Sequence, residues 1–314
     1  MKPKPHALLA VFAGCCLSFA VALTAASAPE STAPRAEHVF IISFDQGSPA
    51  GIEKADMPLF KQMAADGAHT WEACTIVPSI TLPSHTSMLT GVGIQKHQIL
   101  WNDIWAPAKP QLTIPTIFNL AKQAAAGRGR GLVTAAYVSK QKFRLFEYRG
   151  DIDRFSLPAD TSSLGVAASF AEDVASLKPN LCFIHFGEPD AMGHRHGIWS
   201  PEKMKAFADS DAALKIIRDA ITAAGIADTS VIIMTADHGC HDTKNKEGKT
   251  VGTHGSASPD DVIIPWVAWG RGVKPGFTIT APVVQYDTAA TALWLLGVEV
   301  PESFWGRPVT SAFE

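Results

Sequence analysis

The sequence has little of the features that mark several specialised classes of protein. It contains 5 cysteines and 3 tyrosines among 314 residues, charged side chains make up 18%, and the net charge is −3. A disulfide scaffold is richer in cysteine, a disordered chain is richer in charge, and a protein that binds a nucleic-acid polymer carries a basic excess. These absences exclude all three classes. The hydrophobic fraction of 46% is that of a globular protein with a sizeable core.

Only the N-terminus carries a long apolar run. A start with two lysines precedes an almost wholly apolar stretch over residues 7–25, and Ala26-Ser27-Ala28 has the small residues of a cleavage site. We therefore interpret residues 1–28 as a signal peptide. A membrane anchor through about 19 apolar residues and a lipid anchor on Cys15 are the alternatives. The sequence predicts an exported protein, periplasmic or secreted, with no stable membrane span after cleavage.

The rest of the chain shows no internal repeat and no long linker, so residues 29–314 are predicted to form a single domain. Three cysteines lie in it, namely Cys74, Cys182 and Cys240. An odd and widely spaced set is neither a disulfide framework nor a zinc knuckle, although one bridge is possible. The sequence does not indicate an oligomeric state.

Short apolar runs alternate with helical patterns along this domain. Strands are expected over residues 39–44, 132–138, 181–186, 231–236 and 263–269, and helices over residues 58–66, 116–126, 162–177 and 201–224. Fully apolar strands that alternate with helices predict an α/β fold with a mainly parallel, doubly wound sheet and helices on both faces. In such sheets the functional residues gather beyond the carboxyl ends of the strands.

Residue types that bind metals follow these strand ends. The set consists of Asp45, Asp190, His194, Asp237, His238 and His254. Taken singly, an aspartate after a strand is usually a helix cap and a lone histidine is usually structural. Their joint placement after successive strands instead indicates a site for zinc or a similar divalent ion, because oxygen and imidazole ligands suit such ions. Six ligands are too many for one tetrahedral site, so two neighbouring ions are predicted.

Thr81 is the candidate nucleophile. It lies at the start of a predicted helix that runs toward Thr90, where it could simply be an N-cap. A hydroxyl at a helix start also lies beside backbone N–H groups and the positive end of the helix dipole, both of which favour a bound phosphate. A neighbouring metal lowers the pKa of a hydroxyl and so makes an alkoxide accessible near neutral pH.

With these motifs in this order, the chain resembles the alkaline phosphatase superfamily, and within it the nucleotide pyrophosphatase/phosphodiesterase branch. The matching pieces lie between about residues 40 and 256. They are Phe44-Asp45, Thr81-Leu82-Pro83-Ser84-His85 with Thr90-Gly91, His97 through Asn102, Pro189-Asp190-Ala191-Met192-Gly193-His194, Ala236-Asp237-His238-Gly239 and Thr253-His254-Gly255. The resemblance implies an alkaline-phosphatase-like fold.

The resemblance also implies roles for the candidate residues. One metal site would consist of Asp45, Asp237 and His238 with the Thr81 oxygen, and the other of Asp190, His194 and His254. Two divalent ions are implied, with zinc as the expected metal. Thr81 would attack phosphorus and form a covalent phosphothreonine that water then displaces. Asn102 would hydrogen-bond a phosphate oxygen.

Departures from the family pattern limit the choice of substrate. Leu82 stands where many nucleotide-cleaving members carry an aromatic residue, while Trp105 lies near Asn102 and could supply an apolar wall. No lysine or arginine lies within the matched motifs between Asp45 and Lys96. A diester has a single negative charge and needs such a cation less than a monoester does. The sequence therefore predicts an exported phosphodiesterase for small phosphate diesters, nucleotides among the candidates, with substrate contacts from Leu82, Asn102 and Trp105.

Two alternatives stay open at this point. One is a phosphomonoesterase or phosphonate hydrolase on the same scaffold, although such monoesterases usually add a third metal or extra cations, which the sequence does not identify. The other is a degenerate metal-binding protein without activity. A sulfatase is unlike this sequence because no Cys or Ser stands in a C/S-x-P-x-R setting. His85 and His97 match family positions and are interpreted as structural.

Overall fold

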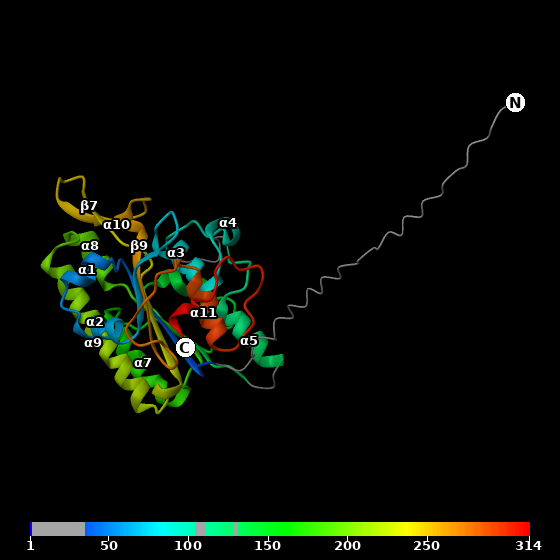
Figure 1. Ribbon diagram of the computed structural model, residues 1–314. Helices are drawn as coiled ribbons and strands as arrows, with labels where there is room; N and C mark the ends of the chain where they lie inside the picture. The colour runs from blue at the N-terminus through cyan, green and yellow to red at the C-terminus, as the bar shows by residue number, and fades with distance from the viewer. Residues whose placement is uncertain (2–34, 104–110, 128–130) are drawn as a thin grey trace. The chain divides into compact units, whose positions relative to one another are not determined.

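A computed structural model describes Met1 and residues 35–103, 111–127 and 131–314, the coloured parts of Figure 1. Nearly all of the predicted signal peptide lies outside these described residues, and so does Trp105. Within the described ranges, no helix combines the length and the apolar character that a membrane crossing requires.

Among the described residues, eight strands form one mixed sheet in the order β10-β2-β9-β6-β1-β5-β3-β4. Their bounds are β1 His38–Phe44, β2 Ala68–Cys74, β3 Thr134–Tyr137, β4 Arg154–Ser156, β5 Leu181–Phe186, β6 Ser230–Thr235, β9 Ile263–Gly270 and β10 Phe277–Thr278. Strand β1 pairs in parallel with both β5 and β6, and β5 pairs in parallel with β3. Strand β9 runs antiparallel between β6 and β2. The predicted mainly parallel sheet is confirmed.

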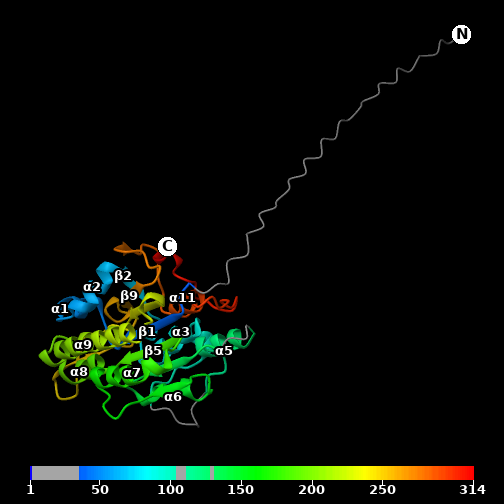
Figure 2. The same ribbon diagram turned by 90° about the horizontal axis from the view of Figure 1, so that it is seen from below.

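Helices cover both faces of this sheet. Their bounds are α1 Pro49–Lys54, α2 Pro58–Asp66, α3 Thr81–Thr90, α4 Ile94–His97, α5 Ile117–Gly127, α6 Arg144–Glu147, α7 Ser163–Leu177, α8 Glu188–His196, α9 Pro201–Ala223, α10 Pro259–Val262 and α11 Asp287–Leu295. Figures 1 and 2 show α2, α7 and α9 on one side of the strands and α3, α5 and α11 on the other. The doubly wound architecture is therefore as predicted.

The side chains of β1 alternate between the two faces of the sheet, and apart from His38 and Ser43 they are apolar. Val39 and Ile41 pack into the hydrophobic cluster that contains residues of α3, α5 and α11. Phe40, Ile42 and Phe44 pack into the cluster of α2, α7 and α9 on the opposite face. Each such fully buried side chain contributes about 1.5–3 kcal/mol. Because both faces are buried, the first polar residue after the strand marks the edge of the sheet, where chemistry can begin.

The sequence did not predict the hairpin of β7 (His241–Lys244) and β8 (Thr250–Thr253). Its strands pair antiparallel, and β7 is mostly exposed and polar, so no apolar periodicity marks it. The hairpin returns the chain to the sheet edge just before His254. Strand β9 was predicted, but its antiparallel direction was not. Cys74, Cys182 and Cys240 are free thiols, so the structure contains none of the disulfides that those three could form.

Candidate metal centre

The carboxyl ends of β1, β5 and β6 meet at one edge of the sheet because the three strands are parallel neighbours. Asp45 follows β1 directly, Asp237 lies just beyond β6, and Asp190 lies in α8, which follows β5. His194 stands four residues after Asp190 and therefore on the same face of α8. This edge is where an open α/β sheet places its functional residues.

Asp45, Asp237 and His238 form a first group, here called the buried triad, whose ligand atoms all lie within 4.8 Å of one another. The Nε2 atom of His238 is 3.5 Å from Asp45 Oδ1 and 3.2 Å from Asp237 Oδ2. Both of these carboxylate oxygens are buried without a hydrogen-bond partner in the described part of the chain. An unsatisfied buried polar group costs about 1–3 kcal/mol, and a charged one costs more. A cation between the three atoms is the partner that fits.

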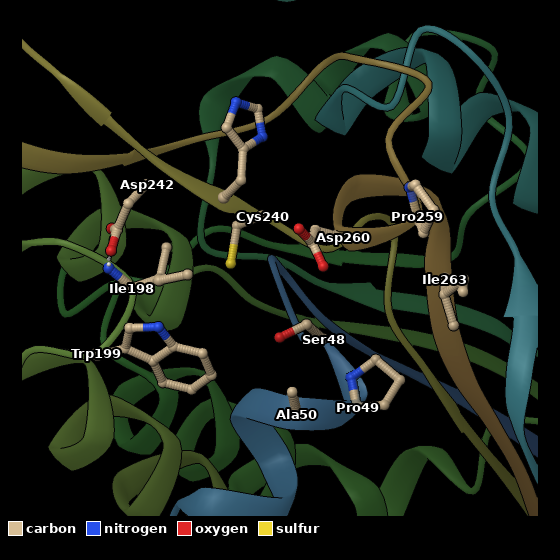
Figure 3. Close-up of a pocket in the computed structure, with 11 residues that line it drawn as sticks. Ser48, Pro49, Ala50, Ile198, Trp199, Cys240, Asp242, Pro259, Asp260 and Ile263 are labelled. Atoms are coloured by element: carbon tan, nitrogen blue, oxygen red, sulfur yellow. Dashed lines mark hydrogen bonds between the residues drawn. The ribbon is translucent and has the colours of Figure 1, made fainter.

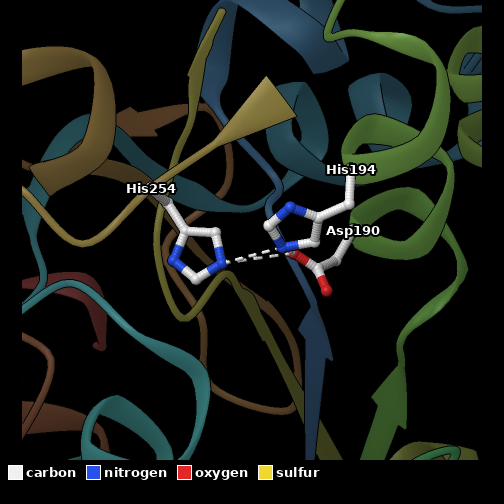
Figure 4. A group of neighbouring side chains, drawn as sticks. All are labelled: Asp190, His194 and His254. Atoms are coloured by element: carbon white, nitrogen blue, oxygen red, sulfur yellow. Dashed lines mark hydrogen bonds and ion pairs between the residues drawn. The ribbon is translucent and has the colours of Figure 1, made fainter. Parts of the chain in front are cut away.

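Asp190, His194 and His254 form a second group, the open triad, within the same 4.8 Å limit. Figure 4 shows the three side chains converging, two from α8 and one from the segment after β8. The Nε2 atom of His194 is 3.1 Å from Asp190 Oδ1 and 3.1 Å from His254 Nε2. Two imidazole nitrogens at this distance need a proton or a cation between them. The His194 side chain is 43% exposed, whereas every side chain of the buried triad is 0% exposed.

Backbone carbonyls fix the tautomer of all three triad histidines. The Nδ1 atoms of His194, His238 and His254 lie 2.9, 2.9 and 2.8 Å from the carbonyl oxygens of Gly252, Gly239 and Ser79. A carbonyl only accepts a hydrogen bond, so Nδ1 carries the proton and Nε2 presents its lone pair to the triad. Metal-binding histidines in proteins are typically oriented in this way. The donor sets of both triads therefore fit divalent ions such as zinc.

Burial and the crowding of three carboxylates control the charges here. Burial, with Asp45 adding to it, raises the pKa of Asp237 well above its usual range. Burial would also raise the pKa of Asp45, but Lys140 and His185 outweigh it and hold that pKa well below its usual range. Burial lowers the pKa of His238 to about 3, which keeps this imidazole neutral and able to bind a metal.

Thr81 lies beside the buried triad. It is the first residue of α3, it is buried, and its Oγ1 is 3.4 Å from His238 Nε2. The N-cap of α3 is Ile80, so the alternative that Thr81 is the N-cap is wrong. The hydroxyl instead points toward the triad at a helix N-terminus, where backbone N–H groups and the helix dipole favour an anion.

Asn102 is held by two donors. Its Oδ1 accepts hydrogen bonds from the backbone N–H of Leu82 and from Lys142 Nζ, both at 2.9 Å. These contacts identify the oxygen side of the amide and leave its Nδ2 group as the donor toward a substrate. The Leu82 side chain, predicted to contact substrate, is fully buried in the hydrophobic cluster of α3, α5 and α11. Its backbone N–H contacts Asn102, while its side chain packs in the core.

Two lysines that the sequence analysis missed lie in the site. Lys140 Nζ pairs with Asp45 Oδ2 of the buried triad and with Asp190 Oδ2 of the open triad, and Lys142 holds Asn102. No extra cation was identified from the sequence, and the structure places these two beside the candidate residues. Both lysines follow β3, so the rule that located the aspartates at strand ends could have found them.

Two other histidines, His185 and His85, contact residues of the site. His185 Nε2 lies 2.9 Å from Asp45 Oδ2, while its Nδ1 lies 2.8 Å from Ser139 Oγ. His85 lies between Ser43 Oγ and the Thr81 carbonyl, each at 2.8 Å, in keeping with its structural interpretation. His185 was not expected to act here because it lies within a strand, where a buried histidine looks like any core residue.

A hollow of about 440 Å³ lies between elements that also carry the triads (Figure 3). Its walls include Ile198 and Trp199 from the α8–α9 connection, Cys240 and Asp242 around the start of β7, and Pro259 of α10. Trp199 is partly exposed there, at 44%. The lining is mostly apolar. Cys240 lines the hollow, and its Sγ also lies 3.0 Å from Lys203 Nζ.

The chain is similar in sequence to known proteins. The family model described as type I phosphodiesterase / nucleotide pyrophosphatase matches residues 39–255, a range that includes both triads, Thr81 and Asn102. Human ectonucleotide pyrophosphatase/phosphodiesterase family member 7 is 23% identical over 244 residues, which are 73% of this chain and 53% of that protein. Human family member 5 is 24% identical over 246 residues, 71% and 49% of the two chains. The chain thus spans about half the length of the curated relatives it matches.

Solved structures show the same fold. Human ectonucleotide pyrophosphatase/phosphodiesterase 5 superposes with a TM-score of 0.70 at 18% identity, covering 88% of this chain and 100% of that one. An inactive threonine-to-alanine variant of the murine counterpart, solved in complex with AMP, gives 0.69 at 17% identity with the same coverage. A 2-O GAG sulfatase gives 0.69 at 13% identity over 88% of this chain and 74% of that one. The alkaline-phosphatase-like fold is confirmed.

Proposed function

Because the chain belongs to the type I phosphodiesterase / nucleotide pyrophosphatase family, we propose that it is a two-metal hydrolase of small phosphate diesters. One observation carries this proposal: two preorganised triads lie at the same sheet edge, and a threonine hydroxyl at a helix start lies 3.4 Å from a ligand atom of one of them. Neither a helix cap nor a structural histidine cluster requires this combination.

The triads are proposed to hold two divalent ions, with zinc expected, that would supply Lewis acidity and stabilise charge on the attacking and departing oxygens. The chain's own residues do the rest. Thr81 Oγ1 loses its proton and forms a bond to phosphorus as the bond from phosphorus to the departing alcohol breaks and that alcohol takes up a proton. The product is a phosphothreonine that still carries the second ester group of the substrate. Water then cleaves the ester bond to Thr81, releases the phosphate product and restores the hydroxyl.

Two features of the chain would stabilise the phosphate during these steps. The N-terminus of α3 offers backbone N–H groups and the positive end of the helix dipole beside Thr81. Asn102 is fixed through its oxygen by Leu82 N–H and Lys142, so its Nδ2 group can donate to a non-bridging oxygen without reorganisation.

The two lysines favour a second candidate function. Lys142 brings its positive charge next to Asn102, and Lys140 offsets negative charge on Asp45 and Asp190. Charge-assisted hydrogen bonds are roughly twice as strong as neutral ones. A monoester dianion, a phosphonate or the second phosphate of a nucleotide would all gain from them. A phosphomonoesterase or phosphonate hydrolase is therefore the runner-up.

A hydrolysis panel tests both candidates. It compares an aryl phosphate monoester, the matching aryl methyl diester, a dinucleotide and an aryl sulfate, each with and without added zinc and with a chelator. We expect zinc-dependent turnover that is faster for the diesters. A tenfold higher kcat/KM for the monoester, about 1.4 kcal/mol at the transition state, would replace the main proposal with the runner-up. Protein that binds two ions and hydrolyses none of the esters would be a degenerate family member.

Export through the leader is a further part of the proposal. The sequence of residues 1–28 supports it, with cleavage after Ala28, and residues 29–314 would then form the mature single-domain enzyme. Expression in a bacterial host followed by N-terminal sequencing of the periplasmic and medium fractions checks this. Full-length protein retained in the membrane fraction would favour the anchor alternative.

A further inference from the structure

Gln46 touches both triads. It follows Asp45 directly, and its side chain is fully buried. Its backbone N–H donates to Asp237 Oδ1 of the buried triad, and its side-chain Nε2 donates to Asp190 Oδ1 of the open triad, both at 3.1 Å. One residue thus holds a carboxylate of each metal site.

Lys203 fixes the orientation of this glutamine. It lies in α9 with 1% of its surface exposed, and its Nζ donates to Gln46 Oε1 and lies 3.0 Å from Cys240 Sγ. An ammonium only donates and a carboxylate only accepts, so the amide has one possible orientation between Lys203 and Asp190. Within the described residues, Lys203 Nζ contacts Gln46 and Cys240 and forms no ion pair with a carboxylate. Lys203 is therefore connected to the triad carboxylate of Asp190 by two hydrogen bonds, one to Gln46 Oε1 and one from Gln46 Nε2.

The backbone at Gln46 supports a functional reason for this arrangement. Its φ is +64°, in the left-handed region that favours glycine. A non-glycine residue there costs of order 1–3 kcal/mol and persists only where its surroundings determine it strongly. Glycine at this position would relieve the strain and would also remove the contact with Asp190. The fold thus keeps the glutamine side chain, which contacts Lys203 and Asp190, in spite of the backbone strain.

We propose that Gln46, oriented by Lys203, is a positioning residue that holds Asp190 in place and so strengthens metal binding at the open triad. This inference rests on the two-metal site of the proposed function. Truncating the Gln46 side chain removes a contact to Asp190 but keeps the backbone contact to Asp237. The loss should therefore fall on the open triad. Replacing a residue that hydrogen-bonds to a metal ligand typically weakens metal affinity by about 10–100-fold.

The test measures zinc affinity at each site by competition with a chelating dye, in the absence of substrate. The variants are Gln46→Ala, Lys203→Met and the double variant, and His194→Ala identifies which binding step belongs to the open triad. Gln285→Ala is the matched control, because Gln285 is a buried glutamine whose side chain has no hydrogen-bond partner within the described residues. It reports the general cost of truncating a buried glutamine.

We expect Gln46→Ala and Lys203→Met each to weaken the open-triad step about 10–100-fold while the buried-triad step changes by less than about threefold. The double variant should match Gln46→Ala, because Lys203 acts through Gln46. Unchanged affinities in Gln46→Ala, or equal weakening of both steps, would overturn the inference. Cobalt substitution adds a second measurement, since the absorption of the open-triad ion should change in Gln46→Ala and not in Gln285→Ala.

The outcomes separate this inference from the proposed function. If wild-type protein shows the predicted binding steps and the Gln46 effect but hydrolyses no phosphate ester, the inference stands and the proposed function fails. If wild-type protein is an active zinc phosphodiesterase and Gln46→Ala binds both ions as wild type does, the inference fails alone.

Discussion

The two triads use similar ligands in different surroundings. The buried triad takes its residues from the ends of β1 and β6, two paired strands at the centre of the sheet. The open triad takes its residues from α8 and from the segment that follows the peripheral β7–β8 hairpin. Core packing therefore preforms one site, whereas the other depends on elements with more solvent contact. Thr81 lies against the buried triad, with its Oγ1 3.4 Å from His238 Nε2.

The pKa values of the histidines also differ between the buried triad and the open triad. In the buried triad, burial dominates and lowers the pKa of His238 to about 3. In the open triad, the hydrogen bond to Asp190 dominates and raises the pKa of His194. Desolvation thus sets the pKa of His238, whereas the neighbouring carboxylate of Asp190 sets the pKa of His194. Four experiments can break or sharpen this contrast.

The largest effect is expected from removing the proposed nucleophile, Thr81, whose Oγ1 lies 3.4 Å from His238 of the buried triad. Thr81→Ala should lower turnover by on the order of 10³-fold or more, yet retain two ions, because three protein ligands remain at each site. Thr81→Ser keeps the hydroxyl and should retain measurable activity. Steady-state kinetics and elemental analysis provide the two readouts. Near wild-type turnover in Thr81→Ala would mean that water attacks phosphorus directly.

Removing one histidine from each triad compares their roles in stability. His238→Ala truncates a fully buried side chain and should cost about 2–4 kcal/mol of unfolding free energy even with a chelator present. His194→Ala truncates a side chain that is 43% exposed and should cost less than about 1 kcal/mol. Urea unfolding of both variants without metal gives these values. Equal losses would show that the open triad is packed as firmly as the buried one.

Metal removal compares how readily each triad exchanges its ion. We expect a chelator to release zinc in two phases of similar amplitude, with the faster phase absent in His194→Ala. The physical reason is that solvent reaches a ligand of the open triad directly, whereas the buried triad must first open. A metal-sensitive dye follows the release. A single phase for wild-type protein would contradict the idea that exposure controls exchange.

Whether a site residue could be predicted from the sequence depended on its surroundings in the chain and in the fold. Asp45 and Asp237 were found because they end continuous apolar strands, and the sheet then brings such ends together. The division of six ligands into two triads came from the family resemblance, since spacing alone does not show which residues meet. Lys142 was missed although it follows a predicted strand, because lysines on surfaces are common. Gln46 was missed because its role lies in long-range contacts that no local pattern encodes.

The smallest effect on catalysis is expected at Lys142, which in the described part of the chain contacts neither triad, so its replacement leaves the triads intact and tests the charge of the substrate. Its ammonium contacts Asn102, whereas Lys140 pairs with a carboxylate of each triad and would disturb both metal sites if replaced.

Lys142→Gln can keep a donor to Asn102 while removing the charge. We expect it to lower kcat/KM for an aryl monoester about tenfold, or about 1.4 kcal/mol, and for the matching methyl diester less than about threefold, because the diester carries less negative charge. Lys205→Met, at an exposed lysine of α9, is the control and should change neither value. Equal losses for both esters would mean that Lys142 acts by holding Asn102 in place and not through its charge, and the case for a monoesterase would then lose its main support.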